Sequence, residues 1–229
     1  MLKNDPLFQE ILVRIREIFS GVRGGHDFDH TMRVLINAAK IAEMELPSED
    51  TESRRIVSFG ALLHDCARPE EDSGKGTVCH AELGRVKSVE LLRSAGCTDE
   101  KFLCTIGECV GRHRYRGKDA PLTLPEKIVY DADKLDSIGA VGIARTFHFA
   151  SHIGARIHNT EQQALNGSEY GSEDTGYREY LVKLRNVPDR MLTESGRKLA
   201  VQRGVFMRQF FEELNRETEE VFRFTGELE

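Results

Sequence analysis

Residues 29–45 read DHTMRVLINAAKIAEME, and this stretch decides the fold class. Its apolar side chains Val34, Ala38 and Ile41 recur at intervals of three and four residues, which places them on one face of an α-helix. Asp29 opens the stretch and is expected to cap the helix, because an aspartate oxygen can accept a hydrogen bond from the free N–H groups of a first turn. The stretch therefore predicts an amphipathic helix.

The same helical period returns along most of the chain. It recurs in residues 7–20, 53–66, 80–95, 99–113, 126–150 and 194–219. Residues 126–150 are expected to form one long or broken helix. Stretches rich in β-formers are short and lie inside these helical patterns. The sequence therefore predicts an all-α bundle that is closed by a C-terminal helix.

The expected domain organisation follows from the point at which the helical spacing of apolar residues ends. Residues 154–176, GARIHNTEQQALNGSEYGSEDTG, are rich in Gly, Asn, Ser, Gln and Glu and predict a mobile loop over one end of the bundle. We expect a single domain over residues 1–229, with a core at about 22–150 and a C-terminal helical segment at 177–219 that frays from Thr218 onward.

Composition excludes several classes of protein. Hydrophobic residues are 39% and charged residues 31% of the 229-residue chain, a balance that suits a soluble domain with a sizeable core. The net charge of -6 argues against a dedicated nucleic-acid binder. No apolar run approaches the roughly 20 residues that span a bilayer, and the N-terminus lacks a signal-peptide pattern. The five cysteines show no CxxC spacing, so we expect a cytoplasmic protein without a disulfide framework.

His64 and Asp65 form the first candidate site. His64 follows Ile56 and Gly60 at helical spacing, so it is expected to point into the core. Asp65 stands at the C-terminal end of the same helix, where the helix dipole disfavours a carboxylate. A buried imidazole needs polar partners, and this carboxylate needs a cation. One bound metal would satisfy both residues.

His30 and Asp133 complete a candidate ligand set. His30 shares the inward face of its helix, and Asp133 lies beside the apolar positions Val129 and Ala132. Two imidazole nitrogens and two carboxylates suit a divalent transition metal, Mn²⁺, Fe²⁺, Ni²⁺, Co²⁺ or Zn²⁺, better than Ca²⁺. Mg²⁺ is kept as an alternative.

Three motifs carry a family resemblance. They are HDFDHTMRV (26–34), LHDCARPEE (63–71) and DADKLDSIG (131–139). In order and spacing they resemble the HD-domain superfamily of metal-dependent phosphohydrolases, and residues 131–145 and 180–200 are similar to a stand-alone subgroup with nucleoside triphosphate pyrophosphatases. The resemblance implies that His30, His64, Asp65 and Asp133 hold one divalent metal. It also implies hydrolysis of a nucleotide or a related phosphate ester or anhydride, in which an activated water attacks phosphorus.

His80 and His113 also lie on inward helical faces. Related proteins use comparable histidines for a second metal or for a substrate phosphate, and a buried histidine bonded to a carbonyl is a third interpretation. Phosphate contact is favoured here because the chain lacks the paired histidines of clear two-metal members. A second metal is left open. His26 is expected to lie in a turn or behind the ligands rather than to bind the metal.

Further residues are assigned by chemistry and position. Asp65, Asp136 and Arg33 are the expected catalytic groups. In an acidic protein, the loop RHRYRGK (112–118) is the best phosphate-facing patch. The expected substrate contacts are His80, His113, Arg112, Arg114, Arg116, Lys118, Lys75 and Arg145.

Two rival functions remain open. A di-iron oxygenase of the same fold would use His80 and His113 as extra ligands, and a sensor would bind nucleotide or metal without turnover. Neither GxxxxGK[ST] nor GxGxxG is present, so a Gly-rich phosphate loop is excluded. The expected partner is a phosphorylated small molecule, with no membrane or nucleic acid, and the protein is expected to be a monomer or homodimer.

Overall fold

The structure, a computed structural model, contains only helices among its described residues, so the predicted all-α class is confirmed. The described residues are 4–22, 24–74, 79–115 and 119–228. Their contacts form two compact units, residues 1–133 with 192–196 and residues 134–191 with 197–229. The single-domain organisation stays a prediction. No described helix is both long enough and apolar enough to cross a membrane.

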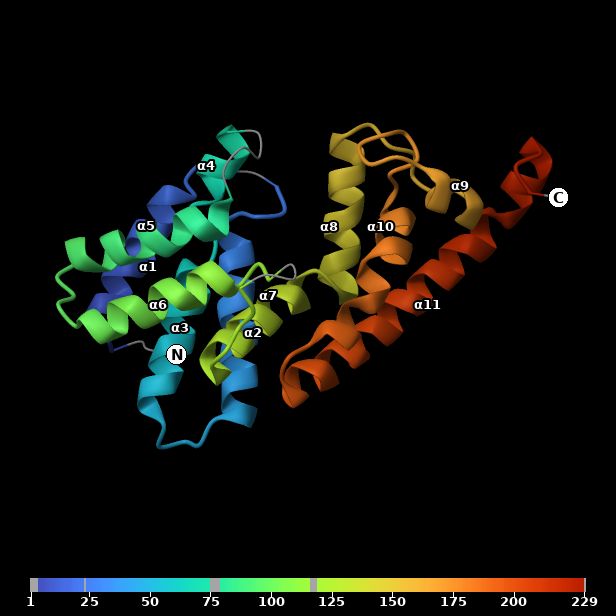
Figure 1. Ribbon diagram of the computed structural model, residues 1–229. Coiled ribbons are helices and arrows are strands. Elements are labelled where there is room, and N and C mark those ends of the chain that lie inside the picture. Colours follow the sequence, from blue (N-terminus) through green and yellow to red (C-terminus); the bar gives the residue numbers. More distant parts are fainter. Residues whose placement is uncertain (1–3, 23, 75–78, 116–118, 229) are drawn as a thin grey trace. The chain divides into compact units, whose positions relative to one another are not determined.

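The first unit is built around one central helix. Its elements are α1 (Pro6–Ile18), α2 (Phe28–Glu45), α3 (Thr51–Leu63), α4 (Arg68–Ser73), α5 (His80–Ser94), α6 (Glu100–Arg112) and most of α7 (Leu124–Asp136). Helix α3 packs against α1, α2 and α6, and α5 lies along α6 (Figure 1). Phe59 of α3 is fully buried and meets Phe8 and Phe102 edge to face, at centroid distances of 5.2 and 5.3 Å. The end of α3 therefore delivers His64 and Asp65 into the interior.

Aspartate caps set where these helices begin. Asp27 accepts a hydrogen bond from the backbone N–H of His30 at 2.9 Å, and α2 begins at Phe28. The expectation that Asp29 caps this helix is therefore wrong, because α2 starts earlier and Asp29 already lies in its first turn. Asp50 and Asp99 cap α3 and α6 in the same way. These caps define where the helices that lead to His30, His64 and His113 begin.

Asp99→Ala is expected to destabilise the protein by about 1 kcal/mol, because the substitution removes the acceptor for the Phe102 N–H at the start of α6. Urea denaturation followed by circular dichroism measures this change. Asp99→Asn keeps a capping oxygen and serves as the matched control, with little expected change. Equal stability of Asp99→Ala and the wild type would show that the cap contributes nothing.

The stretch predicted at 126–150 forms two helices, α7 and α8 (Gly139–His152). The break lies at Gly139, whose φ of +74° belongs to the left-handed region that favours glycine. A Cβ at this position would also lie 3.1 Å from side-chain atoms of Arg203. The broken alternative is the one that the structure contains.

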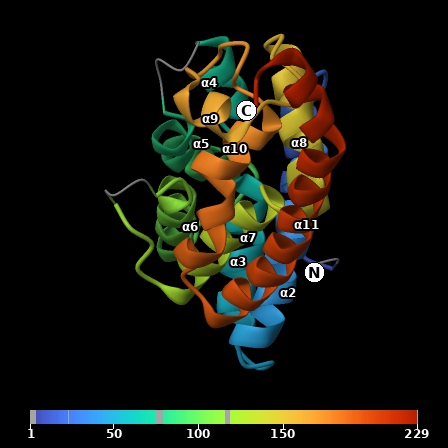
Figure 2. The same ribbon diagram turned by 90° about the vertical axis from the view of Figure 1, so that its right-hand side faces the viewer.

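The second unit packs around Phe211. Its elements are α8, α9 (Glu161–Asn166), α10 (Gly176–Val182), the 3₁₀ helix η1 (Leu184–Arg190) and all but the first turn of α11 (Glu194–Thr225) (Figure 2). Phe211 of α11 is buried and stacks on Tyr180 of α10 and Phe147 of α8 at 4.6 and 6.3 Å. Because α11 continues to Thr225, the C-terminal helical segment is longer than the expected 177–219, while fraying from Thr218 stays a prediction.

Residues 154–176 are only partly the irregular loop that their composition suggests. Thr160 and Gln163 form a capping box, in which each side chain bonds the other's backbone N–H at the start of α9. His158 and Asn159 are buried just before this helix. Residues 161–166 of the predicted loop are therefore helical, while the mobility of residues 154–176 stays a prediction.

Candidate metal centre

Four buried histidines converge inside the first unit, each from the end of a helix. His30 lies in the first turn of α2, His64 directly follows α3, His80 begins α5, and His113 directly follows α6. None of them is more than 3% exposed, and Asp65 is 2% exposed. The packing of α3 and α5 against α6 thus gathers polar groups where apolar side chains would otherwise be expected.

The other three predicted metal ligands lie around Nε2 of His30. His30 Nε2 is 3.2 Å from His64 Nε2 and 3.6 Å from Asp133 Oδ1. Asp65 Oδ2 is 3.5 Å from His30 Nε2 and 3.6 Å from His64 Nε2. His26 joins them, with its Nδ1 3.0 Å from the same oxygen. We call these residues the His30 cluster.

The other oxygen of Asp65 faces a second pair of histidines. Asp65 Oδ1 is 3.1 Å from His80 Nε2 and 3.5 Å from His113 Nε2, and these two nitrogens are 3.2 Å apart. We call this pair the His80 cluster. One buried carboxylate therefore lies between two sets of imidazole nitrogens.

Backbone carbonyls orient two of the rings. His64 Nδ1 donates to the carbonyl of Ala61 at 2.8 Å, and His113 Nδ1 donates to that of Val110 at 2.6 Å. Since a carbonyl only accepts, Nδ1 carries the proton and Nε2 faces the cluster. Nitrogen atoms that approach each other at 3.2 Å repel unless a proton or a cation lies between them. This donor set therefore fits a divalent transition metal.

Burial sets the protonation of the site. Loss of hydration lowers the pKa of His64 to about 4, so the ring is neutral at neutral pH, as a metal ligand must be. Burial alone would raise the pKa of Asp65, but hydrogen bonds from the surrounding histidines, His113, His26 and His30, hold it well below its usual range. The centre thus pairs an ionised carboxylate with a neutral imidazole.

Glu71 is a buried residue outside the predicted set of site residues. Its Oε2 lies 2.6 Å from His80 Nδ1 and 3.0 Å from Arg68, and its Oε1 accepts from Arg114. Hydrogen bonds from His80 and Arg114 outweigh burial and lower the pKa of Glu71 to about 2. No periodic signal marks this residue, because its partners come from two other segments.

The basic residues of the predicted phosphate patch differ in their surroundings. Arg114 joins Glu71 next to His80. Arg112 instead makes ion pairs with Glu108, Asp119 and Glu126. Arg116, Lys118 and Lys75 lie outside the described residues. Of the patch, Arg114 is thus the described residue that the structure brings to the His80 cluster.

The remaining predicted residues are distributed over both units. Arg33 is half-buried on α2, three residues after His30. Asp136 belongs to the second unit, where its buried carboxylate accepts from Arg145 at 2.9 Å. The structure therefore joins an expected catalytic carboxylate to an expected substrate-binding arginine.

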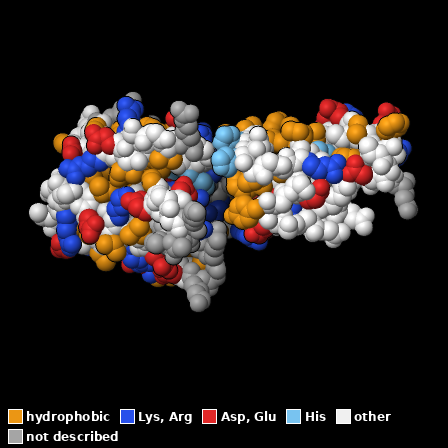
Figure 3. Space-filling view, turned by 90° about the horizontal axis from the view of Figure 1, so that it is seen from above, with side chains coloured by type: hydrophobic (Ala, Val, Ile, Leu, Met, Phe, Trp, Pro, Cys, Tyr) orange, Lys and Arg blue, Asp and Glu red, His pale blue; other side chains and the backbone are white. Residues whose placement is uncertain are grey.

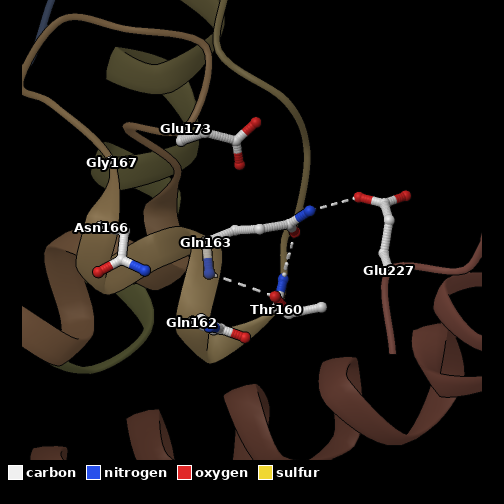
Figure 4. Close-up of a pocket in the computed structure, with 7 residues that line it drawn as sticks. All are labelled: Thr160, Gln162, Gln163, Asn166, Gly167, Glu173 and Glu227. Atoms are coloured by element: carbon white, nitrogen blue, oxygen red, sulfur yellow. Dashed lines mark hydrogen bonds between the residues drawn. The ribbon is translucent and has the colours of Figure 1, made fainter. Parts of the chain in front are cut away.

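A separate pocket of about 460 Å³ lies in the second unit beside α9. Its side chains bond to one another, since Gln163 Nε2 donates to Glu227 at 2.6 Å and Gln163 N–H donates to Thr160 (Figure 4). None of the residues predicted for the site lines it. On the face in Figure 3, positive and negative side chains are interspersed.

Comparison with known proteins assigns the family. The sequence profile of the HD domain matches residues 27–138. The protein YpgQ of Bacillus subtilis is 31% identical over 210 residues, which cover 91% of this chain and 92% of that protein. The crystal structure of YpgQ in complex with ADP superposes with a TM-score of 0.68 at 27% identity, covering 92% of this chain and 94% of that one.

A second solved structure is described as a predicted HD superfamily hydrolase from an uncultured Thermotogales bacterium. It superposes with a TM-score of 0.66 at 30% identity, covering 94% of this chain and 95% of that one. The motifs, the buried His/Asp centre and these full-length similarities agree. The chain therefore belongs to the HD-domain superfamily, in a group of relatives that includes YpgQ.

Proposed function

We propose that this protein is a divalent-metal-dependent phosphohydrolase that acts on a nucleotide or a related phosphate ester or anhydride. The observation that carries the proposal is Asp65, a buried carboxylate whose two oxygens each face imidazole nitrogens. The nucleotide assignment is supported by YpgQ, which was crystallised with ADP.

In this proposal His30, His64, Asp65 and Asp133 hold one cation. When bound, it supplies Lewis acidity to a phosphoryl oxygen and to a water molecule. His64 presents Nε2 because its Nδ1 proton is held by Ala61. Asp65 contributes its negative charge.

The side chains beyond this set act on the substrate. His80 and His113 present Nε2 beside Asp65 Oδ1 and are proposed to contact phosphate. Arg114 offsets phosphate charge next to them. Arg33, Asp136 and Arg145 keep their expected roles as proposals, as do Arg112, Arg116, Lys118 and Lys75.

A metal and substrate screen tests the proposal. Purified protein, stripped with a chelator, is supplied with Mn²⁺, Mg²⁺, Co²⁺, Ni²⁺, Fe²⁺ or Zn²⁺ and with a panel of nucleotides, and the products are separated by chromatography. We expect phosphate or pyrophosphate release that depends on the cation and stops on chelation. Tight nucleotide binding without release under any metal would contradict hydrolysis and favour a sensor.

His113→Ala is expected to lower kcat/KM by roughly 10- to 100-fold while the cation stays bound, since a charge-assisted contact is worth roughly 1.5–3 kcal/mol. Steady-state kinetics and metal analysis measure the two effects separately. His148→Ala, which removes an exposed histidine, is the matched control. Unchanged kinetics in His113→Ala would contradict the phosphate contact.

The arrangement around Asp65 also supports a second candidate. If His113→Ala loses a cation, His80 and His113 are ligands of a second metal, which is the geometry that a di-iron oxygenase would use. Iron in the purified protein, together with an oxygen-dependent absorption change, would favour this function over hydrolysis.

A further inference from the structure

His80 differs from its neighbours in how its ring is held. His64 and His113 each follow a helix and donate Nδ1–H to a carbonyl three residues earlier. His80 is the first residue of α5. The start of a helix offers free N–H groups rather than free carbonyls, so α5 itself supplies no acceptor for Nδ1.

Glu71 supplies the missing acceptor from another helix. Its Oε2 lies 2.6 Å from His80 Nδ1, and the side chain is 7% exposed. A carboxylate only accepts, so the hydrogen between these atoms belongs to His80 Nδ1. Nε2 then remains to face Asp65 and His113, at 3.1 and 3.2 Å.

We propose that Glu71 is a positioning residue, which holds the Nδ1–H of His80 and thereby fixes the ring orientation in which Nε2 faces the centre. The geometric part of this inference stands on the contacts of His80. Its consequence for turnover rests on the proposed phosphohydrolase function.

Two arginines beside His80 Nδ1 leave Glu71 as the acceptor on which its hydrogen bond depends. Arg68 Nη1 and Arg114 Nη1 both lie 3.3 Å from His80 Nδ1, and both also bond to Glu71. A guanidinium only donates. Without the Glu71 carboxylate, Nδ1 would face two donors and would have to accept. The Nδ1 proton would then be lost, and with it the contact that fixes the orientation of the ring.

The test uses nitrogen-15 NMR of the histidine side chains in the full-length, metal-free protein. In the wild type, His80 is expected to carry a proton on Nδ1. In Glu71→Met, which removes the acceptor at similar side-chain volume, the Nδ1 proton is expected to be lost. Glu71→Gln keeps a neutral oxygen and is expected to give a partial loss of the Nδ1 proton, and it covers the case in which Glu71→Met does not fold.

The control is Glu70→Met, which changes the adjacent carboxylate on α4, where Glu70 pairs with Lys87. Its His80 is expected to keep the Nδ1 proton, as in the wild type. An Nδ1 proton retained in both Glu71 variants would overturn the proposal, as would an equal change in Glu70→Met.

Kinetics of the metal-loaded enzyme provide the second readout. Glu71→Met is expected to lower kcat/KM by roughly 10- to 100-fold, the range typical of residues that orient a ligand. In a His80→Ala background the same substitution is expected to have no further effect, because the residue acts through His80. An undiminished effect in that background would overturn the proposal. If the wild type proves inactive but the Glu71 variants still lose the Nδ1 proton of His80, the proposed function fails and the positioning role stands.

Discussion

Asp65→Ala is expected to abolish both cation retention and turnover. One oxygen of Asp65 faces the His30 cluster and the other faces the His80 cluster. The substitution therefore removes a negative charge that the two clusters share. Substitution of a residue that supports a metal ligand typically lowers metal affinity or activity 10- to 100-fold. Loss of this central carboxylate is expected to exceed that range.

Metal analysis of the purified variant and product release under saturating nucleotide check the result. Asp29→Ala is a suitable control, because Asp29 is an exposed carboxylate adjacent in sequence to His30. Circular dichroism verifies that Asp65→Ala is folded. Full activity in a folded Asp65→Ala protein would end the proposed mechanism.

Asp131→Ala is expected to destabilise the first unit by about 3–5 kcal/mol. The buried carboxylate accepts from the backbone N–H groups of Leu192 and Thr193 at 2.9 and 2.8 Å, and from the Thr193 hydroxyl at 2.7 Å. The two buried Thr193 donors each cost roughly 1–3 kcal/mol when left unpaired, and the part-buried Leu192 N–H loses its acceptor as well. The Thr193 hydroxyl in turn accepts from the Gly196 N–H, so the substitution also loosens the start of α11.

Urea denaturation of metal-free protein measures this loss without involving the adjacent ligand Asp133. Thr193→Val removes only the hydroxyl and is expected to cost less than Asp131→Ala. Gly196→Ala provides an independent check, because an added Cβ would overlap Asp131 Oδ2. A loss below about 1 kcal/mol in Asp131→Ala would show that the three bonds matter little.

The helical spacing of apolar residues explains why much of the candidate metal centre is predictable from the sequence. His30 and His64 occupy inward positions of amphipathic helices, and both are fully buried in the structure. The spacing of apolar residues shows which face of a helix points inward, but it does not show which other helix that face contacts. The contact between Glu71 and His80 joins α4 to α5 and leaves no such trace.

Local chemistry explains the differences at helix ends. Asp27 and Asp29 both have a side chain that can cap a helix. Asp27 is the cap because the helical backbone begins at Phe28, directly after it. In residues 154–176, Thr160 and Gln163 are three positions apart, which is a capping-box signal that polar composition conceals. The break at Gly139 depends on its left-handed φ, which a sequence does not specify for a glycine inside an apolar helix.

The position of Asp65 also has a thermodynamic consequence. Because its oxygens serve the His30 and His80 clusters separately, a ligand bound to one cluster changes the charge and orientation that the other experiences. Linkage makes this effect reciprocal, so occupancy of either cluster shifts the affinity of the other by the same factor. Binding at the two clusters is therefore expected to be cooperative, in one direction or the other, rather than a sum of two independent isotherms.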